Sequence, residues 1–286
     1  KNGLTLIDPT GEENTAIVTC TDEPHSLGVQ DYLFLTIKSP ALLPSLKAMK
    51  PLIGKDTTII TCMNGIPHWY FHKLDNKYAN YKIKCLDPNL LIDTILPPDN
   101  IVGSVVYPAC EIVKPGTIKH IAGNRFSLGE PEGSESDRLK FISDILKRAG
   151  FRAPIQKNIR DEIWLKLIGN LSFNPISALT GATLEQICND QGTEAIVRAM
   201  MTEAKIIAEE LGAKINMSIE KRIEGARKVG AHKTSMLQDI EAGKPIEIDS
   251  IIIAVKELGE LTCSPTPYID TILNLTLQKA KLIGCL

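Results

Sequence analysis

The sequence lacks an excess of charge of either sign. Its 286 residues carry 32 lysines and arginines against 34 aspartates and glutamates, which leaves a formal net charge of −2. No dense cluster of lysine and arginine interrupts this balance, so the positive field that nucleic-acid-binding proteins present is missing. We therefore expect a small molecule, and no nucleic acid, as the partner of this chain.

Long apolar runs and paired cysteine motifs are also missing. No run reaches the roughly 20 apolar residues that a membrane-spanning helix needs, and the first residues do not resemble a signal peptide. The 7 cysteines form no C-x-x-C pair. An odd number of cysteines in mostly apolar surroundings is typical of reduced thiols. These absences predict a cytoplasmic protein without a membrane span and without a metal site.

The chain also begins without a methionine. Its first residues, K-N-G-L-T-L-I-D-P-T-G, have the composition of a strand followed by a turn. We expect that the sequence is the later part of a longer polypeptide, or that its first segment is missing.

The first half of the chain alternates between strand-like and helix-like stretches. Residues 31–38 and 57–65 are nearly continuous apolar runs, and the stretch between them has helical spacing with Pro44 near its start. This alternation is typical of a parallel sheet covered on both faces. Residues 101–128 alternate between turn signals, which predicts antiparallel strands added to that sheet, and a helix is expected over 134–149.

The second half of the chain is helical in its periodicity. Apolar residues recur at intervals of three and four, which predicts helices near residues 159–174, 191–212, 217–229, 231–242, 247–260 and 266–283. The sequence therefore predicts an α/β domain over residues 1–157 and an all-helical domain over residues 158–286.

One predicted helix places polar residues among apolar ones. Lys166, Asn170 and Asn174 are four residues apart, so their side chains stack on one helical face. A solvated stripe is the alternative, but asparagine is a poor helix former and solubilises less well than charge. An amide is useful where its donor and acceptor are both bonded, and a lysine in a partly apolar pocket can act as a general acid. We interpret this face as part of a binding or catalytic site.

Polar residues also follow two predicted parallel strands. Lys38 and Asn64 stand where these strands end, and ligands of open α/β sheets bind beyond the carboxyl ends of strands. A solvated strand end and a tight Asn-Gly turn are the alternatives. Farther on, Ser235 is placed to bond a small ligand. Glu247 stands at a predicted helix start, where favourable placement of charge against the helix dipole is the alternative.

Several motifs together resemble the 2-dehydropantoate 2-reductase (ketopantoate reductase) family. The stretches I-R-D-E-I-W-L-K-L-I-G-N-L-S-F-N-P, H-K-T-S-M-L-Q-D-I-E-A-G-K-P-I-E-I-D and N-G-I-P occur in the family's order, and the resemblance covers essentially the whole chain. It implies NADPH-dependent reduction of 2-dehydropantoate to (R)-pantoate, in pantothenate and coenzyme A synthesis. It also implies a Rossmann-like first domain and a second domain like the helical domain of 6-phosphogluconate dehydrogenase.

The resemblance implies a role for each residue of the helical half that matches the family's motifs. Lys166 matches the catalytic lysine, which protonates the carbonyl oxygen as hydride reaches the neighbouring carbon. Asn170 and Asn174 match asparagines that hold the substrate, and Ser235 matches a serine that binds it. Glu247 matches a glutamate that bonds the cofactor and supports catalysis.

The resemblance also implies a cofactor-binding set in the first half of the chain. Asn64 matches the asparagine at the nicotinamide end, where it contacts substrate and cofactor, and Lys38 matches a lysine near the cofactor. Ala109 falls where the family lines the cofactor groove. The cofactor is NADP(H) by resemblance alone. The residues that distinguish NADPH from NADH by its 2′-phosphate normally follow the second strand of the fold, which we expect to be missing from this sequence.

Two departures from the family pattern keep other functions open. Leu184 stands near the place where some members carry another substrate-binding asparagine, which favours a different 2-oxo acid as an alternative substrate. The glycine-rich loop that cradles the pyrophosphate is absent from these 286 residues. A non-catalytic protein that binds an oxo acid is therefore a further alternative. A homodimer is possible through the apolar helices, which can equally fill the core of their own domain.

Overall fold

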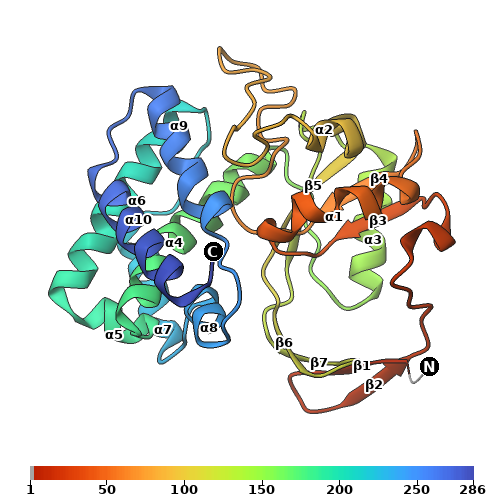
Figure 1. The fold of residues 1–286 in the computed structure, drawn as a ribbon, viewed down its shortest axis with the longest axis horizontal. Coiled ribbons are helices and arrows are strands. Elements are labelled where there is room, and N and C mark those ends of the chain that lie inside the picture. Colours follow the sequence, from red (N-terminus) through yellow and green to blue (C-terminus); the bar gives the residue numbers. More distant parts are fainter. Residues whose placement is uncertain (1–2) are drawn as a thin grey trace. The chain divides into compact units, whose positions relative to one another are not determined.

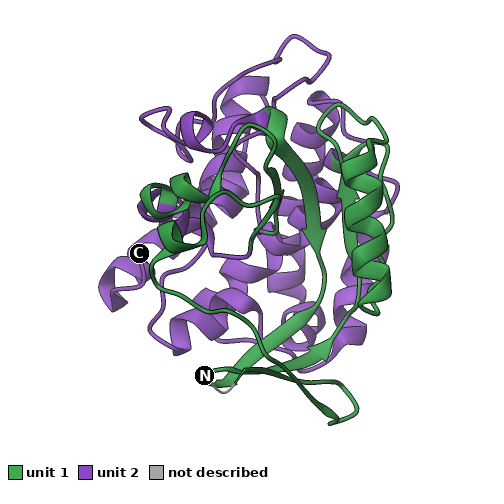
Figure 2. Ribbon diagram, turned by 90° about the vertical axis from the view of Figure 1, so that its right-hand side faces the viewer, with its two compact units in different colours: residues 1–35, 46–62, 99–159 green, residues 36–45, 63–98, 160–286 purple. Residues whose placement is uncertain are grey.

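The computed structural model describes residues 3–286, which form two compact units (Figures 1 and 2). Unit 1 comprises residues 1–35, 46–62 and 99–159, and unit 2 comprises residues 36–45, 63–98 and 160–286. Unit 2 therefore combines the helical second half with two segments from the first half of the chain. The predicted boundary near residue 157 follows chain order and stays a prediction.

The main sheet of unit 1 has four strands in the order β3-β4-β5-β8. These strands are β3 (Tyr32–Leu35), β4 (Thr58–Thr61), β5 (Ile101–Val106) and β8 (Phe126–Gly129). The first three run parallel, and β8 pairs antiparallel with β5. Ile59 and Ile60, on opposite faces of β4, are both fully buried, as the continuous apolar run predicts. The Rossmann-like character predicted for the first domain is confirmed.

Helix α3 (Asp137–Arg148) covers one face of this sheet. Ser136 caps the helix by accepting a hydrogen bond from the Leu139 amide. The apolar face of α3 packs on strand residues in a core of Ile60, Val102, Leu128, Leu139, Ile142, Leu146 and Ala153. Burying each large side chain there contributes about 1.5–3 kcal/mol. The helix predicted over 134–149 is confirmed.

Unit 1 contains a second sheet, in the order β2-β1-β7-β6. Its strands are β1 (Leu4–Ile7), β2 (Glu13–Ala16), β6 (Ala109–Lys114) and β7 (Thr117–Ala122). We expected residues 101–128 to add antiparallel strands to the parallel sheet. This was wrong for β5, which runs parallel to β4, and for β6 and β7, which belong to the second sheet. The two strands form a hairpin around Gly116, and β7 then pairs with β1.

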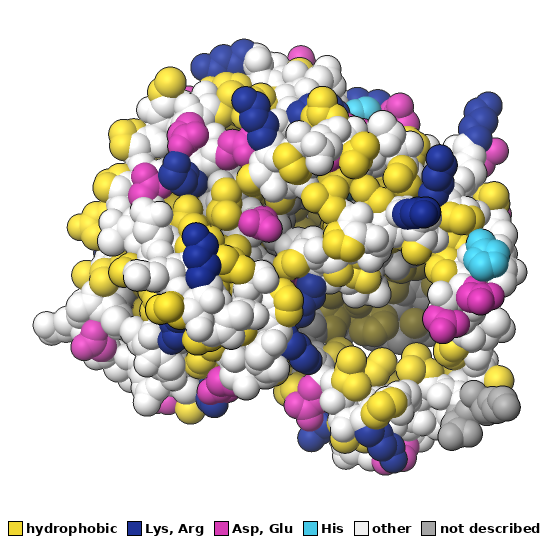
Figure 3. Space-filling view, viewed as in Figure 1, with side chains coloured by type: hydrophobic (Ala, Val, Ile, Leu, Met, Phe, Trp, Pro, Cys, Tyr) yellow, Lys and Arg dark blue, Asp and Glu magenta, His cyan; other side chains and the backbone are white. Residues whose placement is uncertain are grey.

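The second sheet is largely open to solvent. Ile112 is 76% exposed on β6, and Ile17, which follows β2, is 83% exposed. The region around this sheet in Figure 3 accordingly shows apolar side chains among charged ones of both signs. This sheet therefore lacks the continuous apolar cover that the main sheet has.

Unit 2 is mainly helical. Its longer helices are α4 (Ile159–Thr180), α6 (Gln191–Glu210), α7 (Ile219–Val229), α9 (Ala254–Thr262) and α10 (Pro267–Ile283). Its shorter helices are α5 (Leu184–Asn189), α8 (Ser235–Glu241), α2 (Ile92–Ile95) and a π-helix at Asp249–Ile253; α1 (Leu42–Met49) begins here and extends into unit 1. Short 3-10 turns occur at Ser39–Ala41 in unit 2, at Pro24–Leu27 and Lys50–Leu52 in unit 1, and at Pro98–Asn100 where the chain passes from unit 2 to unit 1.

The predicted helices of the second half are confirmed, with three differences. The helix predicted over 247–260 begins with the π-helix Asp249–Ile253 before it continues as α9. Helix α5 was not predicted, although Thr183 and Gln186 form a complete capping box at its start. Helix α4 continues through Pro175 to Thr180, beyond its predicted end near residue 174. The residues from 171 to 178 are all buried, so packing outweighs the backbone hydrogen bond that Pro175 removes. No helix within residues 3–286 is long and apolar enough to cross a membrane.

Candidate functional site

Three predicted residues meet in unit 2 in one chain of hydrogen bonds. Lys166 is half-buried on α4, and its Nζ donates to Asn64 Oδ1 at 2.7 Å. Asn64 Nδ2 in turn donates to Glu247 Oε2 at 3.0 Å. The amide thus uses its acceptor toward the amine and its donor toward the carboxylate. We call this arrangement the Lys166–Asn64–Glu247 chain.

Glu247 is the buried end of this chain. Only 5% of the residue is exposed, and its Oε1 accepts a bond from the Ser39 backbone amide at 3.3 Å. A buried carboxylate needs such donors, because an unpaired charge in an apolar interior is costly. The two donors, Ser39 and Asn64, belong to the two segments of the first half of the chain that are part of unit 2, so Glu247 ties both segments to the helices of that unit.

Backbone geometry explains why a glycine follows Asn64. Gly65 has a positive φ of 87°, and an added Cβ would lie 2.4 Å from the Ser250 carbonyl oxygen. The next residue, Ile66, donates its amide to that same carbonyl at 2.8 Å. Ser250 lies in the π-helix Asp249–Ile253, a rare turn that often occurs at functional sites. Burial also raises the pKa of Asp249, the first residue of this turn.

Lys38 has a different partner, which the sequence analysis missed. Its Nζ forms an ion pair with Asp239 on α8, where Asp239 is 11% exposed and Lys38 is 47% exposed. The available signal was spacing, since Asp239 is four residues after Ser235 on the same helix. Ser235 itself is exposed at the first position of α8. A second missed residue is Ser250, whose Oγ donates to Ser39 Oγ at 3.0 Å.

The two asparagines beyond Lys166 differ in their surroundings. Asn170 is half-buried one turn after Lys166, and Asn174 is only 5% exposed one turn farther. The Nδ2 of Asn174 has no hydrogen-bond partner among the residues that the structure describes. A buried donor left in this state costs about 1–3 kcal/mol, so its presence favours a ligand oxygen as the partner.

Ala109 is the predicted site residue that lies in unit 1. It begins β6, is half-buried and pairs with Ala122 of β7. It is therefore not part of the cluster in unit 2, and its place beside a cofactor stays a prediction.

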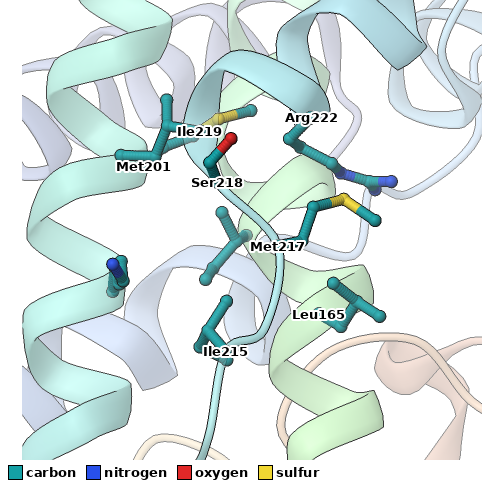
Figure 4. A pocket seen from close by; sticks show the side chains of 9 residues that line it. Leu165, Met201, Ile215, Met217, Ser218, Ile219 and Arg222 are labelled. Carbon is teal, nitrogen blue, oxygen red and sulfur yellow. The ribbon is translucent and has the colours of Figure 1, made fainter.

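A pocket lies elsewhere on α4 (Figure 4). Leu165 and Ile168 of α4 contribute to it, together with Met201 of α6 and Arg222 of α7. Its free volume is about 10 Å³, which is room for about one water molecule. The guanidinium of Arg222 lies against Gly169, where an added Cβ would be 2.1 Å from Nη2. This pocket is packing between helices, and it has no room for a substrate.

The cluster in unit 2 provides the groups that acid–base chemistry at a carbonyl requires. Lys166 is a proton donor held by a neutral amide, and the nearby buried carboxylate of Glu247 fixes that amide. A positioned amine of this kind can protonate an oxygen that gains charge during a reaction. The unpartnered amide of Asn174, two turns along α4, adds a donor for a polar ligand.

Comparison with known proteins identifies relatives along the whole chain. The ketopantoate reductase PanE/ApbA family model matches residues 1–133, and its C-terminal model matches residues 158–280. A 2-dehydropantoate 2-reductase from Mesorhizobium japonicum is 48% identical over 284 residues, covering 99% of this chain and 87% of the relative.

Solved structures agree with this assignment. A structure from Ralstonia solanacearum MolK2 superposes with a TM-score of 0.94 at 38% identity, covering 99% of this chain and 86% of the other. A D-mandelate dehydrogenase in complex with NADH and anilino(oxo)acetate has a TM-score of 0.81 at 22% identity, covering 100% of this chain and 87% of the other. The second likeness shows the shared fold.

The sheet unit and the lysine-bearing helical unit together define a Rossmann-like oxidoreductase. More specifically, the chain belongs to the ketopantoate reductase family. The resemblance seen in the sequence motifs is thereby confirmed.

Proposed function

We propose that this chain reduces 2-dehydropantoate to (R)-pantoate with NADPH, as a cytoplasmic step of pantothenate and coenzyme A synthesis. The observation that carries the proposal is the Lys166–Asn64–Glu247 chain, in which an amine, an amide and a buried carboxylate are joined by hydrogen bonds of 2.7 and 3.0 Å. The 48% identical Mesorhizobium relative supports the choice of substrate.

Each residue of the cluster has a part in the proposed reaction. Lys166 Nζ donates a proton to the substrate carbonyl oxygen while Asn64 and Glu247 hold the amine in place. Asn174 offers its buried Nδ2 to a substrate oxygen, and Asn170 and Ser235 complete the polar grip on the oxo acid. Keeping these donors fixed before the substrate arrives lowers the reorganisation that the reaction needs.

The residues present fit the nicotinamide end of the cofactor. Asn64 and Glu247 carry amide and carboxylate groups of the kind that bind a carboxamide and a ribose, and Lys38 adds a cation nearby. When bound, the nicotinamide supplies a hydride to the carbonyl carbon. The pyrophosphate end has no matching glycine-rich loop in these 286 residues, and the role of Ala109 belongs to the same proposal.

The test is the oxidation of NADPH by 2-dehydropantoate, with the intact mass of the protein measured first. We expect substrate-dependent loss of NADPH absorbance, and slower loss with NADH. A protein of verified mass that binds 2-dehydropantoate but oxidises neither cofactor would contradict the proposal and favour a non-catalytic binding role.

A second candidate is the reduction of another 2-oxo acid. Leu184 stands near the expected place of a further substrate-binding asparagine, and the D-mandelate dehydrogenase structure shows that the same fold holds an aryl oxo acid analogue. A panel of branched, hydroxylated and aryl 2-oxo acids, compared by kcat/KM, separates the two candidates. The second candidate is favoured if kcat/KM is higher for an apolar 2-oxo acid than for 2-dehydropantoate.

Self-association through α10 is part of the proposed function. Tyr268, Leu275 and Leu282 recur at intervals of seven on α10 and are 49%, 49% and 81% exposed. A homodimer that covers these side chains is expected to elute at twice the chain mass of 31.4 kDa in light-scattering chromatography.

A further inference from the structure

Residues 63–98, between β4 and β5, form a segment that packs on the helices of unit 2. We call it the 63–98 segment; it begins just before Asn64 and contains α2 as its only α-helix. Trp69, Tyr70 and Phe71 within it are at most 2% exposed. A loop of this length usually has a function or structure of its own. This one has near its start Asn64, the middle residue of the Lys166–Asn64–Glu247 chain.

Helix α4 holds the near part of the segment by three polar contacts. Arg160 donates from Nε to the Tyr70 carbonyl and from Nη2 to the His72 carbonyl, each at 2.7 Å. Trp164 Nε1 donates to Tyr70 Oη at 2.7 Å. Arg160 is 4% exposed and Trp164 is fully buried, and burial raises the pKa of Tyr70 to about 12. These contacts are made six and two residues before Lys166 on the same helix.

The near part of the segment is also tied to the π-helix. Gly65 packs on the Ser250 backbone, and Ile66 donates its amide to the Ser250 carbonyl. Tyr70 donates its amide to the Pro67 carbonyl at 3.0 Å, which turns the backbone between the two ties. Asn64 therefore leads directly into a short stretch that is fixed at both ends, by Ser250 and by Arg160.

The far part of the segment has separate anchors. Glu257 of α9 accepts bonds from Tyr81 Oη at 2.9 Å and from the Lys84 and Cys85 amides at 2.7 and 2.9 Å. Asn76 Nδ2 donates to the Leu211 carbonyl at 3.1 Å. These anchors stabilise the segment but lie at least 12 residues along the chain from Asn64.

We propose that Arg160, assisted by Tyr70 and Trp164, is a positioning residue that places the Asn64 amide between Lys166 and Glu247. Arg160 acts through its bonds to the Tyr70 and His72 carbonyls in the backbone of the 63–98 segment. The far anchors at Glu257 and Leu211 hold the fold of the segment without affecting Asn64. This inference rests on the proposed function only where turnover is the measured quantity.

The physical basis is the small tolerance of the catalytic cluster. Asn64 makes two bonds in opposite directions, so a shift of its backbone lengthens one or both. Misplacement of a catalytic group by about 1 Å can cost 10²-fold in rate. Helix α4 is held by its own buried face, so loss of the Arg160 contacts moves the segment and Asn64 more than it moves Lys166.

The decisive experiment compares Arg160→Lys in two backgrounds. In the otherwise wild-type protein we expect kcat to fall by about 10- to 100-fold with a much smaller change in KM. In an Asn64→Ala background we expect the same substitution to lower kcat by less than about 2-fold, because the residue it positions is gone. Equal losses in both backgrounds would overturn the proposal, since a general structural loss is additive.

A matched pair of tyrosine variants tests the difference between near and far anchors. Tyr70→Phe removes the bond from Trp164, and we expect kcat to fall by about 5-fold, the equivalent of one hydrogen bond. Tyr81→Phe removes one bond to Glu257 in the same segment, and we expect kcat to stay unchanged. The proposal is wrong if Tyr81→Phe lowers kcat as much as Tyr70→Phe does.

Amide hydrogen exchange separates this inference from the proposed function. Without any substrate, Arg160→Lys should speed exchange at Ile66, whose amide is bonded to Ser250, while Tyr81→Phe should not. Unchanged exchange at Ile66 in Arg160→Lys would overturn the positioning role. Faster exchange at Ile66 in Arg160→Lys, together with a wild-type protein that fails to oxidise NADPH, would keep the positioning role and reject the proposed function alone.

Discussion

The buried carboxylates of the two units have different partners: Glu130 in unit 1 is paired with the Arg138 guanidinium, whereas Glu247 in unit 2 accepts bonds from the uncharged amides of Asn64 and Ser39. Unit 1 is built on apolar strands and α3, with Ile60, Val102 and Leu128 fully buried, and its second sheet stays open to solvent. Unit 2 buries a charged carboxylate and an amide donor, Glu247 and Asn174, at 5% exposure each. Apolar packing is tolerant of small shifts, whereas hydrogen-bonded polar groups require fixed partners. We infer that unit 1 mainly provides stability and that unit 2 holds the fixed geometry that we propose for catalysis.

The largest expected effect on stability lies in unit 1. Glu130 is 1% exposed and accepts bonds from Arg138 Nε at 2.8 Å and Nη2 at 2.6 Å. Arg138→Met leaves a buried carboxylate without its cation, which should lower the free energy of unfolding by about 3 kcal/mol. The surface control Arg198→Met should cost at most about 1 kcal/mol. Urea unfolding measures both, and equal losses would contradict the role given to Glu130.

The next effect sharpens the contrast, because it concerns activity in unit 2. Asn64→Asp removes the donor to Glu247 and sets a second carboxylate beside it, so we expect kcat to fall by about 10²-fold. The control Asn76→Asp, in the same segment and away from the cluster, should retain kcat. Steady-state kinetics with 2-dehydropantoate measures both variants. Normal turnover by Asn64→Asp would contradict the catalytic role proposed for the Lys166–Asn64–Glu247 chain.

A pair of glycine substitutions separates close contact from backbone strain. Gly65→Ala combines a positive φ with a contact of 2.4 Å to Ser250, so it should cost about 1–3 kcal/mol of stability and also lower kcat. Gly212 has a similar φ of 89°, and an added Cβ there would meet only open space. Gly212→Ala should therefore lower the free energy of unfolding by only about 1 kcal/mol. Thermal unfolding compares the two, and equal shifts would show that the contact with Ser250 is unimportant.

The smallest effect is a pH dependence that arises from His68 in unit 2. The residue is 7% exposed, and burial lowers its pKa from 6.5 to about 4, although Asp93 and Asp87 act in the opposite direction. The unfolded chain binds this proton first, so the contribution to stability is full above pH 6.5 and declines toward pH 4. We expect a loss of about 1 kcal/mol between pH 6.5 and pH 5.5.

The matched variants for this effect are His68→Gln and His232→Gln. The first should flatten the decline in stability between pH 6.5 and pH 5.5, and the second, at an exposed histidine, should leave it unchanged. Urea midpoints across this pH range measure the difference. A decline that persists in His68→Gln would assign it to other groups.

Most of the fold was predictable from the spacing of apolar residues and from turn and helix-end signals in the sequence. The continuous apolar runs at 31–38 and 57–65 gave parallel strands, and spacing of three and four residues located the long helices. The second sheet was not predictable in this way, because β1 and β7 are more than 100 residues apart. Alternating apolar and polar residues indicate a strand but not the strand with which it pairs. Helix α5 was missed because its six residues are too short for a periodic signal.

The candidate site was predictable in its residues and less so in its contacts. The spacing of Lys166, Asn170 and Asn174 placed them on one face, and the strand ends indicated Asn64. That Asn64 joins Lys166 to Glu247 is a contact across 102 and 183 residues, which spacing alone does not specify. The partner of Lys38, Asp239, and the contacts of Arg160 were missed for the same reason.

The most direct test of the central claim is the kcat of Lys166→Ala for 2-dehydropantoate and NADPH, beside wild type and Lys205→Ala. Lys205 lies on α6 with Glu209 as its partner, so it controls for loss of a lysine charge. The account predicts that Lys166→Ala loses about 10²–10⁴-fold in kcat and that Lys205→Ala keeps wild-type turnover. Near-normal turnover by Lys166→Ala would contradict its role as the general acid.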